Sequence, residues 1–137
     1  MNSITRVNHI GIRVSDFNVA RDFYAQLGFE YITGPSGPEP VAIVAHPSGV
    51  VINFILNANQ DNTLNQLMDI PTKHTGYTHM ALEVDNAEQT LSNLKALGIP
   101  LSQEPMNHPT GRSFFIRDPD ANVIEFIESP KPVPLNS

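Results

Sequence analysis

The chain has 137 residues, no cysteine and a formal net charge of −6, with 8 lysines and arginines against 14 aspartates and glutamates. A chain of this length can bury roughly two-thirds of the surface that it exposes when unfolded, so no disulfide or metal staple is required for folding. The lack of cysteine excludes disulfides, thiolate ligands and a cysteine nucleophile. We expect no nucleic-acid partner, because no basic patch stands out, and a cytoplasmic protein without membrane contact, because no stretch has the pattern of a signal peptide or a membrane span.

The first half of the chain predicts a strand, a helix and three further strands. Residues 7–14 alternate between two faces, as a half-buried strand does. A helical stripe follows, with Asp16 as its N-cap and Gly28 as the glycine that ends it. The further strands are expected over residues 29–33, 41–45 and 50–56.

The second half repeats this order. A strand containing His79 is followed by a helix that Asn86 caps and Gly98 ends, and Leu101 begins a short strand. The last two strands are expected over residues 113–117 and 122–128. The pattern therefore predicts an α+β fold made of two strand-helix-strand-strand-strand modules.

The repeat also sets the expected boundaries within a single domain. His79 follows His9 by 70 residues, in the similar runs Asn8-His-Ile-Gly-Ile-Arg-Val14 and Thr78-His-Met-Ala-Leu-Glu-Val84. We expect module one at about 5–56, a linker at 57–76, module two at about 77–128 and a proline-rich tail at 129–137. The linker is long for a compact domain, which indicates that it crosses a surface or covers a mouth. Its apolar residues predict one short helix, at Leu64, Leu67 and Met68.

His9, His79 and Glu125 are candidate ligands of a divalent metal ion. Two imidazoles and one carboxylate form a facial set that Fe(II), Mn, Ni, Co and Zn all accept, and that leaves coordination positions open for a substrate. A lone histidine on a strand is more often a surface residue, but both histidines hold the same repeat position. Glu125 shares its strand face with Val123 and Ile127, where an unpaired charge would be costly.

Three stretches resemble one known superfamily. They are His9-Ile-Gly-Ile-Arg-Val-Ser-Asp16, Tyr77-Thr-His-Met-Ala-Leu-Glu-Val-Asp85 and Val123-Ile-Glu-Phe-Ile127. They resemble the vicinal oxygen chelate superfamily, which includes glyoxalase I, extradiol dioxygenases, methylmalonyl-CoA epimerase, fosfomycin-resistance proteins and bleomycin-binding proteins. The resemblance implies two βαβββ modules whose curved sheets surround a metal cleft, in a protein that is commonly a homodimer.

The resemblance also assigns the metal ligands residue by residue. The first-strand ligands of the two modules fall on His9 and His79, and the last-strand ligand of module two falls on Glu125. Members of the superfamily differ at the last-strand position of module one, which is Asn53 here. Glyoxalase I has a glutamate there and methylmalonyl-CoA epimerase a glutamine. Since asparagine is one carbon shorter, a contact through water is the alternative to direct coordination.

Two further matches imply a substrate site of glyoxalase type. Arg13 and Asn57 fall where bacterial glyoxalase I carries residues used toward glutathione. Strand alternation places Arg13 on the face of His9 and Asn57 on the face of Asn53, so Arg13, Asn53 and Asn57 are the predicted substrate-binding residues. The alternative is that Arg13 merely pairs with Glu83, its repeat equivalent.

The implied function is that of a lactoylglutathione lyase-like enzyme, in which a metal chelates neighbouring substrate oxygens while a base moves a proton through an enediolate. Glu125 is the first candidate for the base and Glu83 the second. The alternatives on the same scaffold are an extradiol-type dioxygenase, an epimerase or a thiol transferase. Extradiol enzymes tend to have a tyrosine where this chain has Phe115. The competing class is a non-catalytic module that binds small molecules such as drugs.

Overall fold

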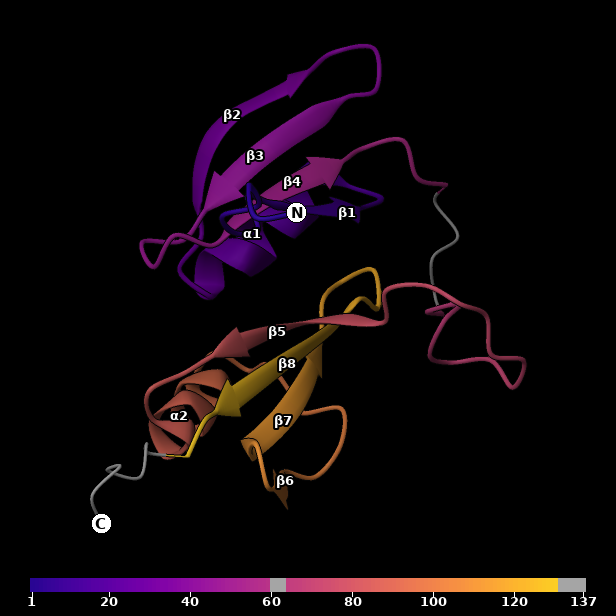
Figure 1. The fold of residues 1–137 in the computed structure, drawn as a ribbon. Helices are drawn as coiled ribbons and strands as arrows, with labels where there is room; N and C mark the ends of the chain where they lie inside the picture. The colour runs from indigo at the N-terminus through magenta and orange to yellow at the C-terminus, as the bar shows by residue number, and fades with distance from the viewer. Residues whose placement is uncertain (60–63, 131–137) are drawn as a thin grey trace. The chain divides into compact units, whose positions relative to one another are not determined.

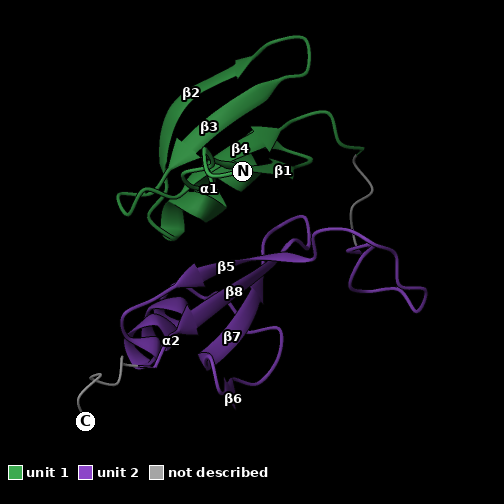
Figure 2. Cartoon of the chain, viewed as in Figure 1, with its two compact units in different colours: residues 1–63 green, residues 64–137 purple. Residues whose placement is uncertain are grey.

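The computed structural model describes residues 1–59 and 64–130. The chain divides into two compact units, Met1–Thr63 and Leu64–Ser137, which we call unit 1 and unit 2 (Figure 2). Within these described residues, each unit has one four-stranded mixed sheet and one helix (Figure 1). None of the helices in the described residues is long and apolar enough to cross a membrane.

Unit 1 has its first and last strands side by side. Its elements are β1 (Ile10–Arg13), α1 (Phe17–Gln26), β2 (Glu30–Ser36), β3 (Val41–Ala45) and β4 (Val51–Ile55). The sheet order is β1-β4-β3-β2, in which β1 runs parallel to β4 and the other pairs are antiparallel. Strand β4 lies beside β1 although α1, β2 and β3 come between them in the sequence. The parallel pair therefore joins residues about forty positions apart.

Unit 2 repeats the same topology. Its elements are β5 (His79–Glu83), α2 (Ala87–Ala96), β6 (Met106–His108), β7 (Gly111–Arg117) and β8 (Val123–Glu128). The sheet order β5-β8-β7-β6 again places the first strand parallel to the last. The two βαβββ units confirm the α+β class and the element order that the sequence predicts.

The predicted helix boundaries are confirmed by their caps. The Asp16 side chain accepts a hydrogen bond from the main-chain N–H of Val19, and Asn86 accepts one from Gln89. These bonds satisfy N–H groups that the first turn of a helix leaves free. Gly28 and Gly98 follow the helices at φ values of 97° and 73°, a conformation that glycine adopts without strain.

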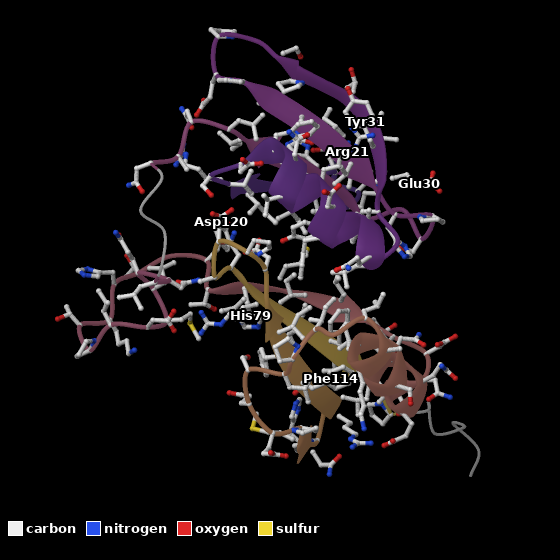
Figure 3. All side chains as sticks on the ribbon, turned by 180° about the vertical axis from the view of Figure 1, so that it is seen from behind. Arg21, Glu30, Tyr31, His79, Phe114 and Asp120 are labelled. Atoms are coloured by element: carbon white, nitrogen blue, oxygen red, sulfur yellow. The ribbon has the colours of Figure 1, made fainter. Side chains whose placement is uncertain are left out.

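One face of each sheet is sealed by its helix. In unit 1, Tyr24 of α1 packs on Phe54 of β4 with ring centroids 5.3 Å apart, and both are fully buried. In unit 2, the Phe114 and Phe126 rings stack with centroids 5.6 Å apart, and both are buried. Figure 3 labels Phe114 in unit 2. Because side chains alternate along a strand, this burial directs every second residue to the opposite, open face of the sheet.

Three local predictions are corrected. No strand begins at Leu101; β6 begins at Met106, because Pro100 and Pro105 bound the intervening segment and cannot donate to a ladder. Strand β1 begins at Ile10, so His9 lies immediately before it. The short helix expected near residue 67 is instead a hydrogen-bonded turn, in which the main-chain N–H groups of Met68 and Asp69 donate to the carbonyl of Asn65.

This turn lies in residues 64–70, a segment that is hydrogen-bonded to β7 and to the turn after it. Asp69 accepts two hydrogen bonds from the Arg117 guanidinium, each 2.8 Å long, and the Asn65 side chain donates to the Ala121 carbonyl at 3.2 Å. The hydrogen bond from Arg117 lowers the pKa of Asp69 from its usual 3.8 to about 2. The ionised pair therefore ties the second half of the linker to unit 2.

Replacing Asp69 by asparagine tests this tie through its pH dependence. The folded-state pKa lies below the unfolded one, so the stabilisation is fully present above pH 4 and is lost as the pH falls toward 2. Because the pair is partly exposed, we expect Asp69→Asn to lower the free energy of unfolding at pH 7 by about 1 kcal/mol. Urea denaturation at pH 7 and at pH 2 measures it. The difference between the variant and the parent should be much smaller at pH 2 than at pH 7, and an undiminished difference at pH 2 would contradict the assignment.

Candidate functional site

The open face of unit 2 brings a predicted imidazole and a predicted carboxylate together. His79 pairs with Val123 and Ala81 pairs with Glu125 in the parallel ladder of β5 and β8. His79 and Glu125 are therefore diagonal neighbours on one face. His79 Nε2 lies 2.9 Å from Glu125 Oε1, within hydrogen-bond distance. Figure 3 shows His79 at the start of β5.

The surroundings of this pair are partly apolar. Phe115 is the register partner of Glu125 on β7, and its ring meets the His79 ring edge-on at 5.7 Å. The Glu125 side chain is only 13% exposed, whereas that of His79 is 32% exposed. The Thr78 hydroxyl lies 2.9 Å from His79 Nδ1, so both ring nitrogens have a polar partner. The Glu125 carboxylate is thus mostly buried beside Phe115, and its partner His79 is the more exposed of the two.

Unit 1 carries the equivalent positions. In unit 1, Asn53 pairs with Gly11, which lies two residues after His9; in unit 2, Glu125 pairs with Ala81, which lies two residues after His79. His9 and Asn53 therefore hold the same relative positions in unit 1 as His79 and Glu125 hold in unit 2. His9 is exposed, and its Nδ1 lies 2.9 Å from the Asn8 side-chain oxygen. In a neutral ring, an acceptor at Nδ1 places the proton on that nitrogen and leaves Nε2 with the lone pair that a metal needs.

The two residues predicted to face glutathione also meet in unit 1. Arg13 Nε donates to the Asn57 side-chain oxygen at 3.0 Å. Both residues donate to Glu39 Oε1, Arg13 at 3.2 Å and Asn57 at 3.1 Å. Glu39 lies in the turn between β2 and β3, and no pattern in the sequence pointed to it. The alternative partner considered for Arg13, Glu83, accepts a hydrogen bond from the Ser129 hydroxyl instead.

The predicted ligands are divided between the units. Over residues 1–59 and 64–130, neither unit by itself gathers three His, Asp or Glu side chains at a spacing that would hold a metal ion. Unit 2 supplies one imidazole and one carboxylate, and unit 1 supplies one imidazole and an amide. Unit 2 therefore carries two of the three predicted metal ligands, His79 and Glu125, and unit 1 carries the third, His9.

The chain belongs to the Glyoxalase/Bleomycin resistance protein/Dioxygenase superfamily, whose family model matches residues 6–126. It is 30% identical over 129 residues to the lactoylglutathione lyase of Escherichia coli O157:H7, an alignment that covers 90% of this chain and 92% of that protein. This relationship agrees with the resemblance that the sequence motifs indicate.

Solved structures share the fold at lower identity. TnmS3, an antibiotic binding protein from Streptomyces sp. CB03234, superposes with a TM-score of 0.71 at 24% identity and covers 95% of this chain and 100% of its own. A mutant of the fosfomycin resistance protein FosX from Listeria monocytogenes, in complex with Mn(II) and 1S,2S-dihydroxypropylphosphonic acid, gives a TM-score of 0.69 at 18% identity, covering 93% and 95%. The fold thus occurs both in an antibiotic-binding protein and in a protein solved with a metal.

A double-mutant cycle tests the contact between His79 and Glu125 in the metal-free protein. His79→Ala leaves a half-buried carboxylate without its partner, so we expect it to lower the free energy of unfolding by about 1–3 kcal/mol. In the Glu125→Leu background the same change should cost about 1 kcal/mol less. Urea denaturation of the four proteins gives the coupling. Additive effects of the two substitutions would contradict a direct interaction.

Proposed function

We propose that this chain is a metal-dependent lyase of glyoxalase type, acting on the hemithioacetal that a 2-oxoaldehyde forms with glutathione. The observation that carries the proposal is the contact between His79 and Glu125 on the open face of unit 2. It joins one imidazole and one carboxylate at the repeat position where unit 1 presents His9. The similarity to lactoylglutathione lyases along nearly the whole chain supports the choice of reaction.

The metal would be held by His9, His79 and Glu125. Two neutral imidazoles and one carboxylate suit Ni, Zn, Fe(II), Mn or Co, and the donor set does not select among them. When bound, such an ion would polarise two neighbouring substrate oxygens and stabilise negative charge on them. The proposed ligands belong to both units, and we propose that the protein works as a homodimer.

The substrate end of the site would be built from Arg13, Asn53 and Asn57. Arg13 is a permanent cation on the face of unit 1 that carries His9, and it is already joined to Asn57. A guanidinium and an amide can both donate hydrogen bonds to a carboxylate, and a glutathione adduct carries two carboxylates. These contacts would bind and orient the peptide part and leave the reacting carbons to the other residues.

Glu125 is the better candidate for the base. The reaction takes a proton from C1 of the hemithioacetal and returns it to C2, so a single carboxylate can accept and then deliver it without any redox partner. Glu125 is close to His79 and shielded by Phe115. Glu83 is exposed and bound by the Ser129 hydroxyl, so it is less suited to the proton transfer.

The dioxygenase alternative receives less support from the same face. Extradiol enzymes tend to use a tyrosine at the place of Phe115, where this chain offers an aromatic ring without a hydroxyl. Phe115 packs edge-on against His79, so it acts as an apolar wall rather than as a hydrogen-bond donor.

The activity is tested with methylglyoxal and glutathione in the absence of oxygen, using protein reconstituted with each candidate ion. We expect formation of the lactoyl thioester, followed by its ultraviolet absorbance. Glu125→Gln should lower kcat by about 10²–10⁴-fold, since it removes the proton acceptor. Glu83→Gln is the matched control and should retain most of the activity.

Three outcomes would contradict this proposal. Oxygen-dependent ring cleavage of a catechol by the Fe(II)-loaded protein, without thioester formation, would assign a dioxygenase. A purified protein that binds none of the candidate ions, and that binds small apolar drugs equally well after His9→Ala, would assign a binding module. Full activity of Glu125→Gln would remove Glu125 from the proton transfer.

A further inference from the structure

In both units, the residue before the predicted histidine ligand contacts the ring of that histidine. Asn8 places its side-chain oxygen 2.9 Å from His9 Nδ1, and Thr78 places its hydroxyl 2.9 Å from His79 Nδ1. Asn8 and Thr78 are 70 positions apart, as the two histidines are, so the contact recurs at one repeat position. Each contact lies within a single unit. A metal-binding imidazole commonly donates from its other ring nitrogen to an oxygen, which orients the ring and fixes its tautomer.

The two oxygens differ in the tautomers that they permit. An amide oxygen only accepts hydrogen bonds, whereas a hydroxyl can accept or donate. Asn8 therefore requires the proton of a neutral His9 ring on Nδ1 and leaves the lone pair on Nε2. Thr78 can accept from His79 Nδ1 when that nitrogen is protonated and can donate to it when it is not. Asn8 thus selects one tautomer, and Thr78 is compatible with both.

Glu125 selects the tautomer of His79 in this arrangement. An ionised carboxylate only accepts hydrogen bonds, and Glu125 Oε1 lies 2.9 Å from His79 Nε2. A neutral His79 ring therefore carries its proton on Nε2, and the Thr78 hydroxyl donates to Nδ1. In that form Nε2 has no lone pair to give to an ion. With these partners, neutral His9 and His79 carry their protons on opposite ring nitrogens.

We infer that Asn8 and Thr78 are positioning residues with different tasks. Asn8 keeps His9 in the form that can bind an ion. Thr78 lets His79 exchange tautomers when its hydrogen bond to Glu125 gives way to an ion. In this exchange the ring loses the Nε2 proton to solvent, gains one on Nδ1 and stays neutral, while the Thr78 hydroxyl turns from donor to acceptor. The exchange at His79 rests on the proposed function, because it requires the ion, whereas the tautomer of His9 does not.

The tautomers are read from the nitrogen NMR signals of the histidine rings, first without metal at about pH 9, where an ordinary imidazole is neutral. His46 serves as an internal reference, because the main-chain N–H of Ser48 donates to its Nδ1 at 3.0 Å and leaves the ring proton on Nε2. We expect His79 to match His46, and His9 to show the opposite pattern. Addition of Zn²⁺ should move His79 to the Nδ1–H pattern and leave His9 in it.

Conservative and disruptive variants separate positioning from folding. Asn8→Leu removes the acceptor, so the Nε2–H form of His9 should appear and Zn²⁺ binding should weaken by about tenfold. Asn8→Asp keeps an oxygen there and should preserve the Nδ1–H form. Thr78→Val should leave the metal-free tautomer of His79 unchanged, because Glu125 still accepts from it, but should weaken Zn²⁺ binding by about tenfold. Thr78→Ser keeps the hydroxyl and should bind Zn²⁺ within about threefold of the parent.

Thr110→Val is the matched control. The Thr110 hydroxyl lies 2.8 Å from His108 Nδ1, which is a contact of the same kind at a histidine outside the proposed ligand set. The substitution should alter the ring signals of His108 and leave those of His9 and His79, and the affinity for Zn²⁺, unchanged. All the substituted side chains are exposed, so every variant should melt within about 3 °C of the parent.

The outcomes distinguish this inference from the proposed function. If His9 keeps the Nδ1–H pattern in Asn8→Leu, or if His79 shows that pattern without metal, the assigned roles are overturned and the lyase assignment stands. If Thr78→Val binds Zn²⁺ as tightly as the parent does, Thr78 has no part in positioning His79. If the parent binds no Zn²⁺ or other candidate ion, the proposed function fails together with the exchange at His79, whereas the metal-free spectra still decide the role of Asn8.

Discussion

The pairing of the first strand of each unit with its last strand is the constraint on which the rest of the structure depends. This pairing is parallel and joins segments that are distant in the sequence, so the local chain does not enforce it. Buried apolar residues fix it instead: Ile52, Phe54 and Ile124 are buried, and Phe54 packs against Tyr24 of α1. A slip by one residue would place these side chains in water and would turn Glu125 away from His79. The hydrophobic core therefore sets the geometry of the polar face.

The two units have kept this frame and diverged in charge. Unit 2 presents an imidazole and a carboxylate that meet directly, whereas unit 1 presents an imidazole and an amide whose oxygen has no partner. The carboxylate at this repeat position is therefore present in unit 2 alone. Arg13 adds a positive charge on the open face of unit 1, where Glu39 now accepts from it.

The sequence predicts the parts that depend on short-range periodicity and on the repeat. The alternation along residues 7–14 and around His79 assigns the correct faces, and Asp16, Gly28, Asn86 and Gly98 end the helices as expected. The contacts made by loops could not be predicted in this way. Arg117 and Asp69 are 48 positions apart, and Glu39 lies in a turn without periodicity, so their partners are set only by the folded chain. The predicted start of β6 at Leu101 was wrong for a different reason. Pro100 and Pro105 lie on either side of that segment, and proline cannot donate a hydrogen bond to a strand ladder.

We propose that His9, His79 and Glu125 bind one and the same ion. Titration of the protein with Mn²⁺, followed by the NMR signals of the histidine rings, tests it most directly, because the paramagnetic ion broadens the signals of its ligands. We expect the signals of His9 and His79 to disappear in parallel and the titration to end at one ion per chain. Broadening of His79 while His9 stays sharp at saturation would contradict it.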